Sequence, residues 1–241
     1  MIAINCDVGE GVYNEELLMP YIQSCNIACG AHAGSKDIIN EVVALAIKNK
    51  VKIGAHPSYP DKENFGRKTM LLSEFDLINT IRSQVNLLKQ EVELQGGKVH
   101  HIKPHGALYN DIAKNKKLAN QFLTAISPYK NDIVLYVPYA SEIETCALEQ
   151  GFNIVYEVFA DRNYNDDLSL VSRTKKDAVL TSLPAIIKHV LEVINTNKIT
   201  TISGEKHTIK GATFCVHSDT ENAVDIVKGI SKFKEDFTKS E

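Results

Sequence analysis

The sequence has no surplus of positive charge. Its 27 Lys and Arg side chains are balanced by 30 Asp and Glu side chains, for a formal net charge of −3. We therefore expect no nucleic-acid partner, because such proteins neutralise phosphates with an excess of basic side chains. The chain also has no uninterrupted apolar stretch near the roughly 18 residues of a membrane helix, so no membrane span is expected.

Signal sequences and disulfide spacing are missing as well. The chain begins with an apolar segment that no basic region precedes, which predicts no signal peptide and a cytoplasmic location. Cysteine occurs five times, an odd number, and no two cysteines have the CxxC spacing of metal and redox motifs. In a reducing compartment these cysteines are expected to be buried free thiols.

Linkers are absent too. No Pro-, Gly- or Ser-rich tract, charge block or internal repeat divides the 241 residues, and 44% of them are hydrophobic. This composition is typical of an ordinary globular protein. We predict a single barrel domain over residues 1–241, with a hairpin insertion at 199–211 and a polar, frayed tail at 234–241.

What the sequence does contain is a regular alternation of apolar and amphipathic segments. The apolar segments are apolar on both faces, which is typical of parallel strands covered on both sides. They are residues 2–6, 25–29, 51–55, 99–103, 133–137, 154–159 and 212–216. Helical periodicity occupies residues 15–23, 36–50, 73–95, 118–126, 141–150, 180–195 and 219–233. This alternation predicts an α/β fold in which seven parallel strands form one closed or nearly closed barrel.

Ionisable side chains gather at the carboxyl ends of these strands. In α/β barrels this end carries the active site, so we predict a convergent polar pocket there. The candidate residues are Asp7, Glu10, His32, His56, Lys103, His105, Glu157, Asp161, Arg162 and His217.

Each candidate has an ordinary structural explanation when it is taken alone. A single histidine at a strand end is more often a hydrogen-bonded turn residue than a catalyst. Asp7 and Asp219 could cap helices, and Asp161 and Arg162 could form a local ion pair. Chance would scatter such residues to both ends of the strands, whereas here they share one end, and this favours a functional site.

Several common catalytic motifs do not occur. The chain has no G-x-x-x-x-G-K-[ST] loop, no G-x-G-x-x-G after the first strand, no G-x-S-x-G and no H-E-x-x-H. ATP is therefore not expected to bind this chain through a phosphate loop. Asp7, His56 and His105 could hold a metal, since carboxylate and imidazole are ordinary zinc ligands. Spacing alone does not show that these three converge, so no metal ligand is assigned.

Six segments, in this order, carry a family resemblance. They are NCDVGE at 5–10, NIACG at 26–30, IGAHPSYPD at 53–61, FGR at 65–67, KPHGALYN at 103–110 and FADR at 159–162. Together they resemble the LamB/YcsF family of 5-oxoprolinase A subunits over essentially the whole chain. The resemblance implies a (β/α)7-type, TIM-like barrel of the glycoside hydrolase/deacetylase kind. It also implies ATP-dependent opening of 5-oxo-L-proline to L-glutamate with partner subunits B and C.

The resemblance suggests a division of labour, in which the partners phosphorylate the lactam and this chain opens the activated ring. Two positions depart from the family pattern. Ser218 stands where the family usually has glycine, and Ala31 stands where it often has phenylalanine. Both changes bear on substrate fit more than on reaction type, since a glycine permits a positive φ that serine adopts only with strain.

Opening the activated ring requires a general base, a general acid and cationic anchors. We assign the base to Asp7, with Glu157 as second choice, and give proton or hydrogen-bond donation to His56 and His105. The substrate-binding group comprises Lys103, Arg162, His32 and Glu10, and the supporting group comprises Asp161 and His217.

Two other functions are consistent with the same residues. A metal-dependent deacetylase acting on an N-acetylated sugar would use the same barrel, with Asp7, His56 and His105 on a divalent ion. A non-catalytic binding or regulatory subunit would only sense the small acid. Fold analogy alone does not separate these functions.

Overall fold

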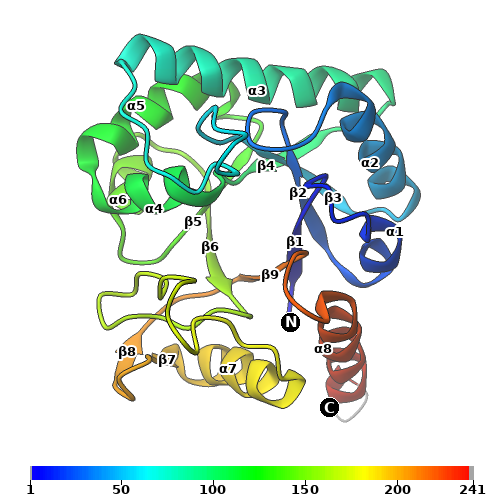
Figure 1. Ribbon diagram of the computed structural model, residues 1–241, viewed down its shortest axis with the longest axis vertical. Helices are drawn as coiled ribbons and strands as arrows, with labels where there is room; N and C mark the ends of the chain where they lie inside the picture. The colour runs from blue at the N-terminus through cyan, green and yellow to red at the C-terminus, as the bar shows by residue number, and fades with distance from the viewer. Residues whose placement is uncertain (1, 239–241) are drawn as a thin grey trace.

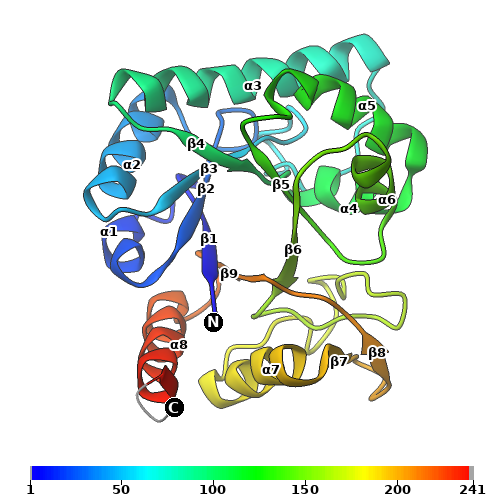
Figure 2. The ribbon, with the colours of Figure 1, turned by 180° about the vertical axis from the view of Figure 1, so that it is seen from behind.

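The barrel predicted from the strand pattern is present and closed. In the computed structural model, which describes residues 2–238, seven parallel strands close in the order β1-β2-β3-β4-β5-β6-β9 (Figures 1 and 2). The strands are β1 (Ile4–Val8), β2 (Ser24–Ala28), β3 (Lys52–His56), β4 (Val99–Ile102), β5 (Val134–Val137), β6 (Ile154–Phe159) and β9 (Thr213–His217). Because β9 pairs with both β1 and β6, it closes the ring. The predicted α/β fold with a parallel seven-stranded barrel is confirmed.

Helices surround the strands, as Figure 1 shows. They are α1 (Glu15–Leu18), α2 (Lys36–Lys48), α3 (Glu74–Leu94), α4 (Gly106–Lys114), α5 (Lys116–Ile126), α6 (Glu142–Glu149), α7 (Leu183–Thr196) and α8 (Ala223–Thr238). Short 3-10 helices, η1 (Met19–Tyr21) and η2 (Ser127–Tyr129), follow α1 and α5.

The long helix α3 illustrates how the sequence pattern produces an element. Its first turn is capped by Ser73, whose hydroxyl accepts a hydrogen bond from the Asp76 N–H at 3.1 Å. Such a cap satisfies a helix N–H that has no partner within the helix. Leu77, Ile81 and Leu88 recur at helical spacing and are fully buried in the core. The helix therefore buries one apolar stripe and leaves its opposite face in water.

Three helices differ from the sequence prediction. The helix predicted over 15–23 ends at Leu18 and is followed by the 3-10 helix η1. Helix α4 was not predicted, because its glycine start and short apolar stripe are typical of a turn. Gly106 has a φ of 57°, and a Cβ there would lie 2.6 Å from the carbonyl oxygen of Gly66. Helix α8 begins at Ala223 rather than at Asp219, so Asp219 does not cap it as expected.

Outside the barrel, β7 (Lys198–Thr200) and β8 (Lys206–Thr208) pair antiparallel at the site of the expected hairpin. Helix α8 continues through Thr238, so residues 234–238 of the expected frayed tail are helical. Residues 239–241 of that tail lie outside the described part.

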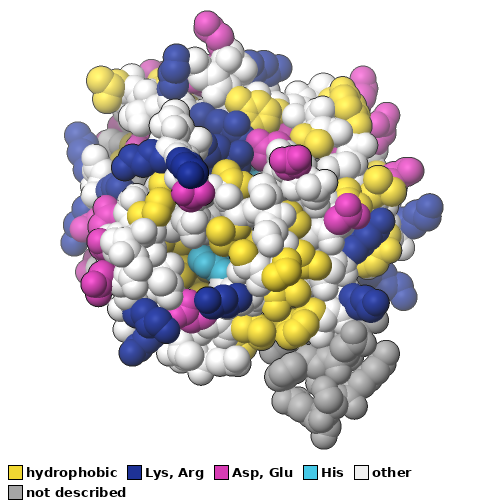
Figure 3. Space-filling model, turned by 60° about the horizontal axis from the view of Figure 1, so that its bottom comes forward, with side chains coloured by type: hydrophobic (Ala, Val, Ile, Leu, Met, Phe, Trp, Pro, Cys, Tyr) yellow, Lys and Arg dark blue, Asp and Glu magenta, His cyan; other side chains and the backbone are white. Residues whose placement is uncertain are grey.

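Charged side chains of both signs are spread over the face in Figure 3, in keeping with the net charge of −3. Among the described residues no helix is both long and apolar enough to cross a membrane.

Candidate active site

The ten predicted site residues lie at one end of the barrel. Glu157 lies within β6, His56 and His217 end β3 and β9, and Lys103 directly follows β4. Asp7 lies inside β1, one residue before its end, and not after the strand as predicted. The loops that follow the strands supply Glu10, His32, His105, Asp161 and Arg162.

A cavity of about 460 Å³ opens at this end. Six of the predicted residues line it, namely Asp7, His56, Lys103, His105, Arg162 and His217. The other four stand behind the wall and contact it, namely Glu10, His32, Glu157 and Asp161. The volume lies within the range of small-molecule sites.

Lys103 is the centre of a buried ionic cluster on one side of the cavity. Its Nζ lies 2.8 Å from Asp7 Oδ1, 3.1 Å from Glu157 Oε1 and 3.0 Å from Cys215 Sγ. Burial alone would lower the pKa of Lys103, but the Asp7 and Glu157 carboxylates outweigh it and raise the pKa well above its usual value. The lysine expected to anchor substrate is therefore an ammonium that the chain's own carboxylates already bind.

The two candidate bases have opposite environments. Burial would raise the pKa of Asp7, but His56 and Lys103 hold it well below 3.8, so Asp7 is a carboxylate at neutral pH. Asn26 Nδ2 also donates to Asp7 Oδ1 at 2.7 Å. Burial raises the pKa of Glu157, against the effect of Lys103. A raised pKa suits a base, but Asp7 lines the cavity and Glu157 does not. Asp7 is the better candidate, because a general base must first be within reach of the proton that it takes.

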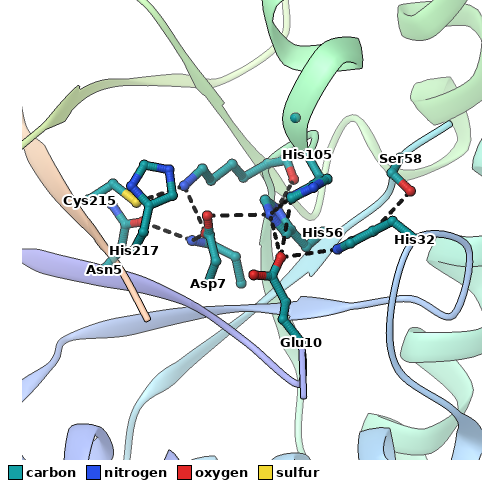
Figure 4. A network of polar contacts seen from close by, with 12 residues as sticks. Asn5, Asp7, Glu10, His32, His56, Ser58, His105, Cys215 and His217 are labelled. Atoms are coloured by element: carbon teal, nitrogen blue, oxygen red, sulfur yellow. Dashed lines mark hydrogen bonds and ion pairs between the residues drawn. The ribbon is translucent and has the colours of Figure 1, made fainter. Parts of the chain in front are cut away.

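Three histidines and Glu10 form a second cluster, shown in Figure 4, which meets the first where His56 Nε2 lies 3.5 Å from Asp7 Oδ2. His105 Nδ1 lies 3.0 Å from His56 Nε2 and 3.2 Å from Glu10 Oε1. His32 Nε2 lies 3.0 Å from the same Glu10 oxygen. The rings of His32 and His105 stack with their centroids 3.8 Å apart.

The histidines differ in their affinity for a proton. Burial lowers the pKa of His32 to about 4 and also lowers that of His105. Burial would lower the pKa of His56 as well, but the Asp7 carboxylate outweighs it and raises the pKa above 6.5. His56 is therefore the imidazole that carries a positive charge most readily, next to a carboxylate of the cavity wall.

Arg162 is committed largely to its own loop. Its Nε donates to the Ala178 carbonyl at 3.2 Å, and its Nη2 donates to the Val171 carbonyl. The side chain thus holds the segment 163–180 against the cavity. Only the remaining N–H groups of Arg162 are left for the substrate binding assigned to it.

Asp161 and His217 are linked to each other. One Asp161 oxygen lies 3.0 Å from His217 Nδ1, and the other accepts the His217 backbone N–H at 3.0 Å. The His217 ring stacks on Phe159, with centroids 5.1 Å apart. Asp161 therefore fixes the orientation of a ring that lines the cavity, which fits the supporting roles assigned to both residues.

Sequence reasoning missed the basic rim of the cavity. Arg67 and Arg173 line it and both pair with Asp219, with Arg173 Nη2 at 3.3 Å from Asp219 Oδ1. Asp219, expected as a helix cap, thus links two loops far apart in the chain. Arg67 belongs to the FGR segment that carries the family resemblance, and this segment could have indicated a site residue. No sequence feature pointed to Arg173.

Asn26 was missed because an amide in a strand is not ionisable. It donates to Asp7 and to Asn5, and its Oδ1 accepts from His101 Nε2 at 2.7 Å.

At Ser218, where the family usually has glycine, the backbone φ is not positive. Serine therefore occupies this turn without the backbone strain that a positive φ would cause.

With this geometry in place, comparison with known proteins is decisive about ancestry. The model of the LamB/YcsF family matches residues 2–239. The chain belongs to the LamB/YcsF family. Among its relatives, a protein named as the A subunit of 5-oxoprolinase, from Bacillus cereus (strain B4264), is 37% identical over 235 residues. That alignment covers 95% of this chain and 93% of the relative. A Staphylococcus epidermidis (strain RP62A) protein of the same name is 38% identical with the same coverage.

A solved LamB/YcsF-like structure agrees with the fold. The crystal structure of the lactam utilization protein from Thermus thermophilus superimposes with a TM-score of 0.90 and 28% sequence identity. The match covers 98% of this chain and 97% of that one. The TIM-like barrel implied by the LamB/YcsF resemblance is thereby confirmed.

Proposed function

We propose that this LamB/YcsF chain opens the lactam ring of 5-oxo-L-proline to give L-glutamate, as the A subunit of an ATP-hydrolysing 5-oxoprolinase with B and C subunits. The names of its relatives and of its structural neighbour support a lactam substrate. The cavity at the carboxyl ends of the strands has the volume for a small acid. We expect the reaction to take place in the cytoplasm, where ATP is available.

A lactam is a resonance-stabilised amide, so its carbonyl carbon is a poor electrophile. Phosphorylation of the carbonyl oxygen by the partner subunits would remove this stabilisation. Water then adds to the carbonyl carbon, and the bond to the ring nitrogen breaks as that nitrogen takes a proton. A second water hydrolyses the resulting acyl phosphate to the glutamate carboxylate and phosphate. The absence of a phosphate loop in this sequence is consistent with ATP binding elsewhere in the complex.

Asp7 is the proposed base, because it is an ionised carboxylate on the cavity wall. His56 lies 3.5 Å from Asp7 Oδ2 and has a raised pKa, so it can supply the proton that the ring nitrogen takes. The basic side chains of Arg67, Arg173 and Lys114 line the same cavity and suit the carboxylate and phosphoryl groups of the substrate.

One observation carries the proposal: a buried carboxylate, Asp7, faces the cavity between an ammonium, Lys103, and an imidazole, His56. The test is glutamate release from 5-oxoproline and ATP with this chain alone, with B and C alone, and with all three. We expect turnover only from the complete mixture and no ATP hydrolysis by this chain alone. Full turnover by B and C without this chain would overturn the proposal.

The deacetylase alternative is kept because His56 and His105 do converge with a carboxylate beside the cavity, although that carboxylate is Glu10 rather than Asp7. Its test is acetate release from an N-acetylated oligosaccharide by this chain alone, where we expect none. The regulatory alternative predicts that calorimetry detects 5-oxoproline binding to this chain while the complete mixture keeps its rate when Asp7 is changed.

A further inference from the structure

Three atoms that can bind a metal, one from the end of β3 and two from the loops after β1 and β4, meet beside the cavity. His56 Nε2 and His105 Nδ1 are 3.0 Å apart, and Glu10 Oε1 lies 3.2 Å from the His105 atom and 3.7 Å from the His56 atom. The His56 and His105 side chains and that of Glu10 are 6% exposed or less. Figure 4 shows the three side chains pointing toward one another.

The outer nitrogens of both histidines are already used as donors. His56 Nδ1 lies 2.7 Å from the Lys103 carbonyl oxygen, and His105 Nε2 lies 2.9 Å from the Phe65 carbonyl oxygen. A carbonyl only accepts, so these two nitrogens carry the hydrogens. In the neutral rings, His56 Nε2 and His105 Nδ1 are consequently bare lone pairs that face each other and a carboxylate. Lone pairs at this distance repel unless a proton or a cation lies between them.

The spacing of the three atoms fits a metal ion. Zinc bonds of about 2.0–2.1 Å in tetrahedral geometry put neighbouring ligand atoms about 3.3–3.4 Å apart. The three observed separations, 3.0, 3.2 and 3.7 Å, bracket this value. Metal-bound histidines generally donate the other ring N–H to a carbonyl or carboxylate, as both of these rings do.

Glu10, rather than Asp7, supplies the carboxylate. One Asp7 oxygen is bound to Lys103 and Asn26, and the other lies 3.5 Å from His56 Nε2, whereas a single Glu10 oxygen contacts both imidazoles. A second group of possible ligands, Asp7, Cys215 and His217, already has the Lys103 ammonium against two of its members. Glu10 is held in place from behind by His32, whose other nitrogen contacts the Ser58 hydroxyl at 2.9 Å.

We propose that Glu10, His56 and His105 bind a divalent transition-metal ion, with Zn²⁺ the best match. Two imidazoles and one carboxylate are a common protein ligand set for a zinc ion that keeps one position open. The open position would supply Lewis-acid or water-activating chemistry next to Asp7, and with the ion bound His56 would be a ligand rather than the proton donor. The sequence spacing of Asp7, His56 and His105 did not allow a metal ligand to be assigned. The distances between the side-chain atoms support the two histidines as ligands, with Glu10 rather than Asp7 as the carboxylate.

The experiment measures metal binding to the whole chain, without partners or substrate. The protein is stripped with a chelator, the chelator is removed, and ZnCl₂ is titrated by calorimetry while Co²⁺ is followed by visible absorption. We expect one equivalent of each ion and the absorption of a tetrahedral Co²⁺ site. His32→Gln should weaken binding by about 10–100-fold, the usual effect of an outer partner. Glu10→Gln and His105→Gln should each weaken it further.

The matched control is His207→Gln, on the exposed hairpin, which removes a histidine and should leave the titration unchanged. Circular dichroism melts of every variant show which are folded, and two separate ligand variants keep the test informative if one does not fold. No saturable binding to the wild-type chain, or equal binding to all folded variants, would overturn the proposal and indicate a proton shared by the two rings. Glutamate release is not measured here, so this result is independent of the proposed reaction.

Discussion

The two sides of the cavity neutralise their buried acceptor groups in different ways. On the lysine side, the Lys103 ammonium is part of the chain and lies between Asp7 and Glu157. On the histidine side, Glu10 meets two imidazoles whose outer nitrogens are already used as donors. The cation of the lysine side is therefore in place as soon as the chain folds. The histidine side depends on an exchangeable proton or ion, and its chemistry can be adjusted without unfolding the barrel.

The largest effect is expected from Lys103→Met, which tests the lysine side. The change leaves the Asp7 and Glu157 carboxylates buried without their cation. Breaking a buried pair in this way costs about 3–5 kcal/mol of unfolding free energy. Urea denaturation of the isolated chain measures it. A loss below about 1 kcal/mol would mean that Lys103 is free to act mainly in substrate capture, as expected from its position in the sequence.

His105→Gln tests the histidine side and should act on rate more than on stability. A positioned proton donor contributes about 10²–10⁴-fold to turnover. We expect the maximal rate of the three-subunit mixture to fall within that range, with a smaller change in KM. Steady-state kinetics over a range of 5-oxoproline, with partners in excess, gives both. An unchanged maximal rate would remove His105 from the catalytic group.

A pH-dependent effect is expected from His101, a buried histidine on β4 that contacts Asn26. Burial holds the pKa of His101 well below 6.5, so as the pH falls the unfolded chain takes up this proton before the folded chain does. His101 therefore does not affect the free energy of unfolding above pH 6.5. Below pH 6.5 it lowers that free energy by about 1.4 kcal/mol per pH unit. His101→Gln should remove this part of the slope between pH 6.5 and pH 5.

Urea denaturation at several pH values measures that slope. His207→Gln, which removes a hairpin histidine outside the barrel, is the control. Equal slopes for wild type and His101→Gln would show that His101 is not held neutral in the folded chain.

The smallest effect on stability is expected from Asp219→Asn, at the rim outside both clusters. Its ion pairs with Arg67 and Arg173 are partly exposed, with 26–40% of each side chain accessible. Exposed pairs of this kind contribute about 0–1 kcal/mol. Thermal or urea unfolding should therefore change by less than about 1 kcal/mol. A loss of several kcal/mol would show that Asp219 holds the two loops together.

The sequence predicted the strands well, for a physical reason. Parallel strands covered on both faces are continuous apolar runs, and the polar residues that end them must share one edge of the barrel. Helix α4 escaped prediction because Gly106 at its start is typical of a turn. The hairpin, in contrast, was readable from its turn residues at 203–206.

The partners of each site residue could not be predicted in the same way. They depend on the register between strands, which sets Asp7 beside Asn26 on β2 and beside His217 on β9. Single-sequence patterns do not contain that register. This is why Lys103 and Arg162 were expected to be free anchors, although one is buried between carboxylates and the other is bound to backbone carbonyls.

The central claim is that the residues around this cavity open the lactam ring, with Asp7 as the general base. The direct measurement is glutamate release from 5-oxoproline and ATP by the three-subunit mixture containing Asp7→Asn, with the exposed Asp37→Asn on α2 as control. Asparagine keeps the shape of the side chain but cannot accept the proton. We predict a fall of about 10²–10⁴-fold for Asp7→Asn, in a chain that remains folded, and none for Asp37→Asn. Near-normal turnover by a folded Asp7→Asn chain would contradict the account.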